Sequence, residues 1–218
     1  MPKQPRAVLE NVFAFPPNRD TLGGTAYLIV ENDGNILIDA PPWIAEIQDF
    51  LAERGGVRTI FLTHRDNRGK ATQIQNDTGC TLVVQEQEAY LLPDADVKTF
   101  QDEIAILPNL TGIWTPGYSP GSSCAYYANA GGVLFSGRHL LPNREGMARP
   151  QQTSKTFHWR RQLRSVKTLR DRFSPETLAL LCPGSNTGFL RGKRAVENAY
   201  EVLANFKFDE YSHHPSLP

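Results

Sequence analysis

The sequence predicts an α/β (α+β) fold in which two mixed sheets pack face to face and are covered by helices. Residues 25–30 and 35–39 are apolar, β-rich runs joined by Asp33-Gly34, a strong hairpin-turn signal that indicates an antiparallel pair. The strands that follow alternate with helical patterns, so hairpins and crossover helices occur in one chain. The second half repeats this strand-then-helix rhythm, which fits two packed sheets.

In the first half, apolar residues at helical spacing predict a helix at 43–54, and Gly55-Gly56 ends it. A buried strand at 59–63 follows the glycines. The remaining elements expected here are a polar helix at 68–78, a strand at 81–85, a short helix near 86–91 and an irregular acidic segment at 93–103.

In the second half we expect strands near 112–115, 123–128, 132–136 and 177–182 and helices at 157–173 and 190–206. The helix at 157–173 should bury one apolar stripe: Trp159, Leu163, Val166, Leu169 and Phe173. Its opposite face is basic: Arg160, Arg161, Arg164, Lys167 and Arg170. Such a face is usually solvated, but it could also dock an acidic partner or RNA.

Length and composition set the class of protein. A chain of 218 residues with 40% hydrophobic content can bury a sizeable core, and we expect a single domain at 1–208 with a flexible tail at 209–218. No run of eighteen apolar residues or secretion signal occurs, which favours a cytoplasmic protein without a membrane partner. A net charge of zero makes nucleic acid an unexpected partner. The isolated Cys80, Cys124 and Cys182 are expected to be buried thiols.

The segment Phe61-Leu-Thr-His64-Arg65-Asp66-Asn67-Arg68-Gly69 carries the clearest motif. It resembles the metallo-β-lactamase-fold family, in which such a strand leads into H-x-H-x-D-H, whose side chains hold two zinc ions. His64 alone matches that pattern, and Asp66, Arg68 and Gly69 stand at the other ligand positions. A guanidinium has no free lone pair and glycine has no side chain, so two of these four positions cannot bind zinc.

Three later segments resemble the same family in the family's order. Trp114-Thr-Pro-Gly-Tyr118-Ser-Pro-Gly-Ser122-Ser resembles its P-G-H-T-x-G-S turn, with Tyr118 in place of the histidine ligand. Leu134-Phe-Ser-Gly-Arg138 resembles its strand ending in G-D, with Arg138 in place of the bridging aspartate. Leu181-Cys-Pro-Gly-Ser185 resembles its strand ending in P-G-H, with Ser185 in place of the last histidine.

Asp39 is the position that the chain retains. The strand Asn35-Ile-Leu-Ile-Asp39 matches the family's L-I-D strand, whose aspartate orients the metal loop from behind the metal ligands. With it, the resemblance spans about residues 25–188 in five ordered motifs and implies a four-layer αββα sandwich. The whole chain also resembles a group of cyanobacterial proteins of this fold.

The resemblance therefore implies a degenerate site that does not hold a dinuclear zinc centre, and we expect no metal cofactor. A catalytic zinc usually has three protein ligands, whereas this site offers His64, Asp66 and Tyr118. His139 is expected to be structural, because it directly follows Arg138 on a strand and so faces the other way. His158 lies at a helix start.

Two hypotheses account for the altered pocket, which the resemblance places around these residues: His64, Asp66, Arg68, Tyr118, Arg138 and Ser185, with Asp39 behind them. In the first, Arg68 and Arg138 form ion pairs with Asp39 and Asp66 and fill the vacated cavity. In the second, the pocket binds a small anion such as a phosphate ester or a carboxylate. As a leftover of the metal loop, His64 is expected to hydrogen-bond Asp66 or Asp39, and metal-free acid–base work by His64 and Asp66 is the alternative.

The function that we expect is non-hydrolytic: small-anion binding, or a scaffold that contacts another protein. The alternative is a metal-dependent hydrolase of the metallo-β-lactamase superfamily with an atypical mononuclear or metal-free site. A weaker signal is the loop at 184–188, which precedes Arg191, Lys193 and Arg194 and could present backbone amides to an anion. A glycine turn with a purely geometric role is the favoured interpretation of that loop.

Overall fold

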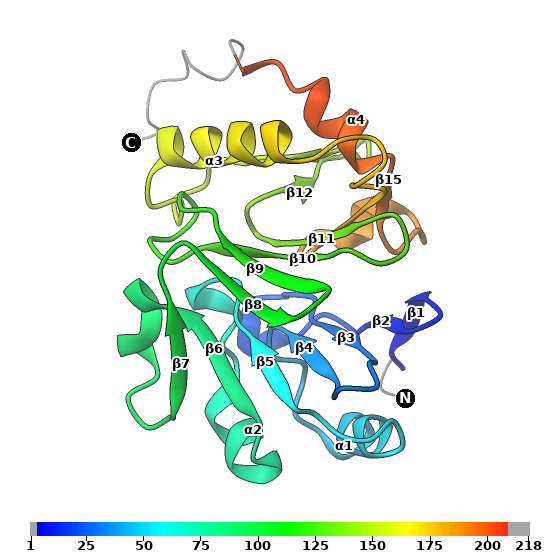
Figure 1. Cartoon of the computed structure of the whole chain (residues 1–218), viewed down its shortest axis with the longest axis vertical. Coiled ribbons are helices and arrows are strands. Elements are labelled where there is room, and N and C mark those ends of the chain that lie inside the picture. The colour runs from blue at the N-terminus through cyan, green and yellow to red at the C-terminus, as the bar shows by residue number, and fades with distance from the viewer. Residues whose placement is uncertain (1–3, 209–218) are drawn as a thin grey trace.

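The computed structural model describes residues 4–208, and in them two sheets pack face to face (Figure 1). The first sheet has the strand order β1-β2-β3-β4-β5-β6-β7, antiparallel from β1 to β4 and parallel from β4 to β7. Its strands are β1 (Arg6–Leu9), β2 (Val12–Ala14), β3 (Tyr27–Ile29), β4 (Ile36–Ile38), β5 (Thr59–Phe61), β6 (Thr81–Gln85) and β7 (Val97–Phe100).

The second sheet has the order β15-β14-β11-β10-β9-β8, in which only the β11–β14 pair is parallel. Its strands are β8 (Glu103–Leu107), β9 (Leu110–Trp114), β10 (Ser123–Tyr127), β11 (Val133–Gly137), β14 (Leu180–Pro183) and β15 (Val196–Glu197). A small antiparallel ribbon of β12 (Leu141–Pro142) and β13 (Ala148–Arg149) follows β11.

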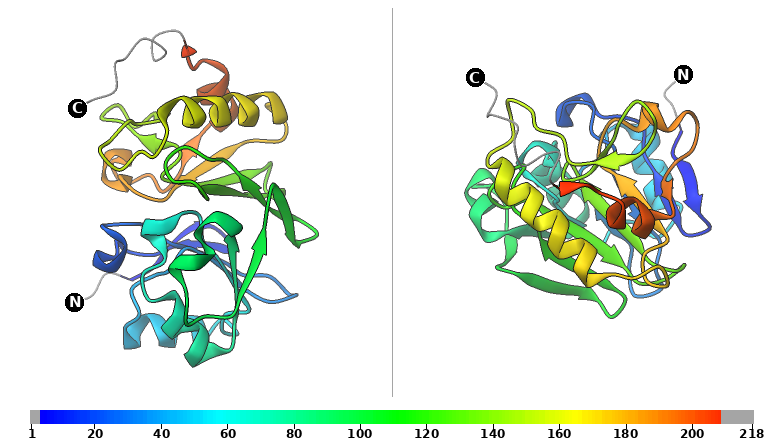
Figure 2. Two further views of the ribbon diagram at one scale, coloured as in Figure 1. Left: turned by 90° about the vertical axis from the view of Figure 1, so that its left-hand side faces the viewer. Right: turned by 90° about the horizontal axis from the view of Figure 1, so that it is seen from above.

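Helices cover the outer face of each sheet (Figures 1 and 2). The first sheet carries α1 (Ala45–Ala52) and α2 (Ala71–Thr78), and the second carries α3 (Trp159–Arg172) and α4 (Ala199–Ala204). One buried cluster fills the space between the sheets, where the Tyr27 and Phe135 rings lie 5.2 Å apart, and one cluster lies beneath each helix pair. The predicted αββα sandwich of mixed sheets is therefore confirmed.

Most predicted elements form where the sequence indicates. The hairpin at 25–39 forms as β3 and β4, and the helices at 43–54, 68–78 and 157–173 form as α1, α2 and α3, shorter by a few residues. His158 begins α3 as its N-cap, since its Nδ1 accepts a hydrogen bond from the Arg161 amide. The segment at 86–91 forms a 3-10 helix, η3 (Glu86–Leu91).

The helix predicted at 190–206 is wrong. This segment contains the end of a 3-10 turn, η4 (Thr187–Leu190), then β15, then the short α4. Arg191, Gly192 and Asn198 adopt positive φ angles of 49°, 94° and 52°, and a right-handed helix cannot pass through such residues. Val196 instead pairs with Leu181 of β14.

Two strands lie where the sequence predicted irregular chain at 93–103. The edge strand β7 pairs in parallel with β6, and β8 begins at Glu103. Edge strands are difficult to recognise because only part of each face is buried, and Lys98 and Thr99 of β7 are exposed. The first hairpin, β1 and β2, was also not predicted. The tail expected at 209–218 lies outside the described residues.

None of the helices in the described part of the chain combines the length and apolar character needed to cross a membrane.

Candidate functional site

The residues singled out by the motifs lie at one end of the sandwich, where loops from the two sheets meet. The Ser123 amide of β10 donates to the carbonyl of Thr63, which follows β5, at 2.8 Å. The Thr25 amide, before β3, donates to the carbonyl of Gly184, after β14, at 2.9 Å. These main-chain bonds join the two sheets directly, so the loops that carry the site are fixed relative to each other.

Asp39 is buried directly after β4 and holds the loop that follows β5. Its carboxyl accepts hydrogen bonds from the Thr63 amide at 2.8 Å, from the Thr63 hydroxyl at 2.8 Å and from the Asn67 side chain at 2.6 Å. Burial raises the pKa of Asp39 to about 7, although these three donors act in the opposite direction. All the donors come from the motif segment, so Asp39 positions that segment.

Asn67 was not recognised as a site residue, because the motif alignment treats it as a spacer. The 3-10 turn η2 (Arg65–Asn67) brings it inward, where it is fully buried against Asp39. Gly24 packs closely against Asn67, since a Cβ added at Gly24 would lie 2.7 Å from Asn67 Oδ1. An asparagine within a loop motif gives no sequence signal for this inward orientation.

Arg68 lies on the outer side of the motif loop, beside η3. It lies one residue after η2, is exposed, and donates through Nη1 to the Leu91 carbonyl of η3 at 3.3 Å. The resemblance places Arg68 at the aspartate position of the motif, whereas Asn67 is the side chain that the turn η2 buries against Asp39.

His64, Asp66 and Tyr118 form a compact cluster. The Tyr118 hydroxyl donates to Asp66 Oδ2 at 2.5 Å, and the Tyr118 ring lies edge-on to the His64 ring with centroids 4.8 Å apart. His64 is buried, and its Nδ1 accepts a hydrogen bond from the Asp66 amide at 3.2 Å. The expected bond from His64 to a carboxylate is therefore replaced by one to the main chain.

Burial holds the pKa of His64 well below its usual value, and the positive charges of Arg138, Arg65 and Lys155 lower it further. The ring is accordingly neutral near pH 7. Because Nδ1 is an acceptor in this tautomer, Nε2 carries the proton and is a donor. Burial raises the pKa of Tyr118 above its usual value, with its bond to Asp66 as a second cause, so the phenol also stays protonated.

The expected ion pairs of Arg68 and Arg138 with Asp39 and Asp66 do not occur among the described residues. Arg138 reaches across to the other sheet, where its Nη2 donates to the carbonyls of Thr21 at 3.0 Å and Leu22 at 2.9 Å. Asp39 is already satisfied by Thr63 and Asn67, and it has no guanidinium partner within residues 4–208.

Lys155 supplies the cation for Asp66 instead. Its Nζ lies 3.9 Å from Asp66 Oδ2, and its carbonyl accepts a hydrogen bond from Arg65 Nη2 at 3.0 Å. Main-chain bonds from Phe157 and His158 to the carbonyls of Tyr118 and Gly117 hold this segment against the site. Lys155 belongs to a long connection without a periodic pattern, so the sequence offered no signal for it, whereas Arg65 lay inside the motif.

Two buried N–H groups of the site have no hydrogen-bond partner among residues 4–208: His64 Nε2 and Arg138 Nε. Gly137, the neighbour of Arg138 in the chain, lies against His64, since an added Cβ there would lie 3.1 Å from His64 Cδ2, the ring carbon bonded to Nε2, and the charge of Arg138 acts on the His64 ring. Ser185 is also buried here, because the Gly184 amide next to it donates to the Gly137 carbonyl at 2.7 Å.

The residues of this site do not fit a dinuclear zinc centre. Within the described range, no group of three or more histidine, cysteine, aspartate or glutamate side chains is placed to hold a metal ion. His64 and Asp66 are the available donors of the usual types, and Asp66 already accepts from Tyr118. Arg138 brings a positive charge to the region, which opposes cation binding.

The sequence matches no protein-family model and no curated protein. Solved structures are similar in shape. The structure of TMB-1 aligns with a TM-score of 0.72 at 12% identity, over 98% of this chain and 100% of that one. MIM-2 metallo-β-lactamase gives 0.68 at 20% identity, over 93% and 87%. A metallo-β-lactamase family protein of Thermus thermophilus gives 0.67 at 18% identity, over 94% and 81%. This chain therefore has the metallo-β-lactamase fold.

Proposed function

We propose that this metallo-β-lactamase-fold chain binds a small anion, a carboxylate or a phosphate ester, at the junction of His64 and Arg138, and that it is not a dinuclear zinc hydrolase. The observation that carries the proposal is the pair of buried N–H donors, His64 Nε2 and Arg138 Nε, that lack an acceptor among the described residues. The positive charges of Arg65, Arg138 and Lys155 act on His64.

The first support is hydrogen bonding. More than nine in ten buried polar groups in proteins have a partner, and an unsatisfied one costs roughly 1–3 kcal/mol. Both atoms here are donors in the states that the surroundings favour, so the partner that they need is an acceptor. The oxygen atoms of a carboxylate or a phosphate ester would satisfy both.

The second support is the balance of charge. Arg65, Arg138 and Lys155 all act on the buried His64, and the carboxyl groups near them are Asp66, Asp39 and Glu88. Burial raises the pKa of Asp39 and of Glu88 and so favours their uncharged forms, which leaves Asp66 as the main negative charge opposite three cations. An anion would meet favourable potential at this point, and the low dielectric of the buried site would strengthen the attraction.

The third support is that neither His64 nor Tyr118 is suited to acid–base catalysis near neutral pH, and that Asp39, whose pKa is about 7, is buried with its carboxyl already bonded to Thr63 and Asn67. Tyr118 is held in its protonated form, and the lowered pKa of His64 makes it a weak base near neutral pH. The donor set does not fit the metals that activate water in this fold. We therefore favour a binding role over a hydrolytic one.

The test compares two exposed lysines. Calorimetric titration with acetate and with inorganic phosphate should give saturable binding to the wild-type chain, and Lys155→Ala should weaken it about threefold, as expected for removal of one partly screened charge. Lys167→Ala, which removes an exposed lysine from α3, is the matched control and should leave the affinity unchanged. Equal effects of both variants, or no saturable binding, would refute the proposed site.

Metal analysis separates this proposal from its alternative. After mild dialysis, the purified chain should hold far less than one zinc or iron per molecule. A near-stoichiometric metal content that Asp66→Ala abolishes would instead favour the atypical mononuclear hydrolase.

A further inference from the structure

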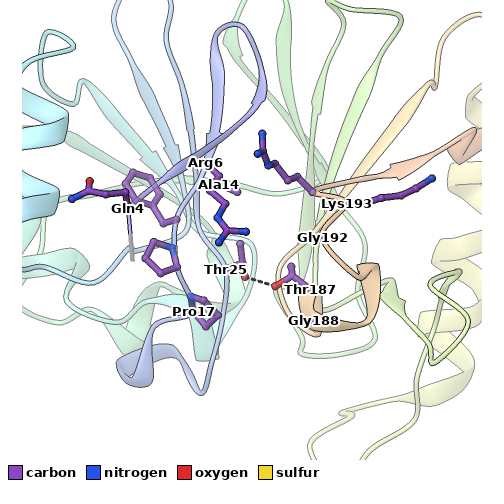
Figure 3. A pocket seen from close by; sticks show the side chains of 12 residues that line it. Gln4, Arg6, Ala14, Pro17, Thr25, Thr187, Gly188, Gly192 and Lys193 are labelled. Carbon is purple, nitrogen blue, oxygen red and sulfur yellow. Dashed lines mark hydrogen bonds between the residues drawn. The ribbon is translucent and has the colours of Figure 1, made fainter. Parts of the chain in front are cut away.

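A cavity lies between the edge strands of the two sheets, with Thr25 in its lining (Figure 3). It has a volume of about 260 Å³, just below the range usual for ligand pockets. One wall comes from the β1–β2 hairpin and the chain after it, and the other comes from η4 and the approach to β15. None of the residues of the His64–Arg138 junction lines it.

The cavity is divided into an apolar wall and a cationic rim. Ala14, Phe15, Pro16 and Pro17 form the apolar wall. Arg6, Lys193 and Arg194 bring three positive charges, and no acidic side chain of the described residues lines the cavity. This combination of an apolar surface with a few polar groups is typical of small-molecule sites.

The three cations differ in whether groups of the protein already bind their N–H donors. Lys193 forms an ion pair with Glu197 at 2.8 Å and extends away from the cavity in Figure 3. Arg194 donates through Nη1 to the Ala7 carbonyl, which uses one of its five N–H groups and fixes the side chain beside β1. Arg6 is exposed and has no side-chain hydrogen bond or ion pair in the described part of the chain. Arg6 and Arg194 are therefore the guanidiniums available to a ligand.

Hydroxyl groups add a further polar contact. Thr25 and Thr187 come from opposite walls, and their Oγ1 atoms lie 3.4 Å apart, where Figure 3 shows them facing each other. Either hydroxyl can donate to an oxygen atom between the walls. The loop at 184–188, whose backbone amides the sequence suggested for an anion, leads into η4 and β15 and not into the predicted long helix, so recognition would depend on these side chains.

We propose that this edge cavity is a separate binding site for a small organic anion, namely a carboxylate or phosphate group joined to an apolar part about the size of one ring. The anionic group would lie at Arg6 and Arg194, because guanidinium offers paired N–H donors that match these groups. The apolar part would lie against Phe15 and the two prolines. A cationic ligand is disfavoured because no carboxylate of the described chain lines the cavity.

Gly188 provides a variant that closes the cavity with little effect on the fold. A Cβ added there meets no atom within 4 Å, and its backbone φ lies outside the left-handed region. A leucine side chain at this position would extend into free space at the cavity wall, so Gly188→Leu should fold and should fill the site.

The experiment is a titration of the full chain, followed by two-dimensional NMR and calorimetry, with benzoate and phenyl phosphate as probes. We expect both to bind and to shift the resonances of Thr25 and Thr187. Arg6→Ala should weaken the binding that Thr25 and Thr187 report about tenfold, the effect of a charge-assisted hydrogen bond pair, and Gly188→Leu should abolish their shifts. Benzyl alcohol and benzylamine match the ring without its negative charge and should bind at least tenfold more weakly.

Two controls keep the outcome interpretable. Arg144→Ala removes an exposed arginine outside the cavity and should leave benzoate binding unchanged. Lys155→Ala tests the His64–Arg138 junction and should leave the benzoate-induced shifts of Thr25 and Thr187 unchanged, so failure of one site is distinguishable from failure of the other. The proposal is overturned if benzyl alcohol binds as tightly as benzoate, or if folded Gly188→Leu and Arg6→Ala keep the wild-type affinity.

Discussion

The hydroxyl of Tyr118 and the carboxylate of Asp66 meet at 2.5 Å, across the seam between the two sheets. Tyr118 follows β9 of the second sheet, and Asp66 belongs to the turn after β5 of the first. Tyr118 is buried, whereas the Asp66 side chain keeps 19% of its surface exposed. The bond therefore joins the two halves of the site at the border between interior and solvent.

Removal of the Tyr118 hydroxyl should weaken the contact between the two sheets at this site. We expect Tyr118→Phe to lower the free energy of unfolding by about 2 kcal/mol, the usual range for a hydrogen bond to a charged group. Urea denaturation at pH 7 measures the change. Tyr90→Phe is the matched control, because Tyr90 is 74% exposed and its variant should stay within about 0.5 kcal/mol of the wild type. Equal stability of both variants would contradict an energetic role for the bond.

A comparison of Gly137 with Gly79 separates the steric cost of an added Cβ from the cost of the left-handed backbone conformation, because only Gly137 is crowded. It has a φ of 51°, and an added Cβ would lie 2.4 Å from Thr63 Oγ1. Gly137→Ala should destabilise the chain by about 3 kcal/mol, because the left-handed backbone and the overpacking both contribute. Gly79→Ala, at a φ of 70° with open space around it, should cost only about 1 kcal/mol. Thermal and urea unfolding of the two variants give the comparison.

Asp39 should make stability depend on pH. Its pKa is raised from 3.8 to about 7, so between these values the folded state binds more protons than the unfolded state. Stability from this group is therefore greatest below pH 4 and is lost as the pH rises towards 7, by an amount on the order of a few kcal/mol. Asp39→Asn should flatten that dependence, and asparagine tolerates the φ of 65° found here. An unchanged pH profile in Asp39→Asn would contradict the raised pKa.

His139 should act with the opposite sign. It is buried, both ring nitrogens lack a partner in the described chain, and burial lowers its pKa to about 3. Between pH 6.5 and 3 the unfolded state binds the extra proton, so stability is lost as the pH falls through this range. His139→Phe removes the titrating group and should move acid unfolding to lower pH. Circular dichroism against pH tests this, and earlier acid unfolding of the variant would disprove it.

The fold could be predicted from the sequence because its motifs are short and local. Asp39, His64 and Tyr118 each follow an apolar strand, and the strand ends bring them to one side of the sandwich. Which of the two side chains, Asn67 or Arg68, points into the protein could not be predicted, since η2 rotates the chain within three residues. Lys155 and the chain at 190–198 were missed for a related reason: each depends on long-range contacts or on positive φ angles that apolar periodicity does not encode.

The bonds from Arg138 to the carbonyls of Thr21 and Leu22 have a consequence for how the molecule is assembled. They join a loop of the first sheet to a strand end of the second by a side chain that is made with the polypeptide and cannot dissociate from it. These two bonds thus form together with the fold and depend on no component other than the polypeptide. Chelating agents have nothing to extract from these bonds, and the supply of trace elements to the cell does not limit their formation.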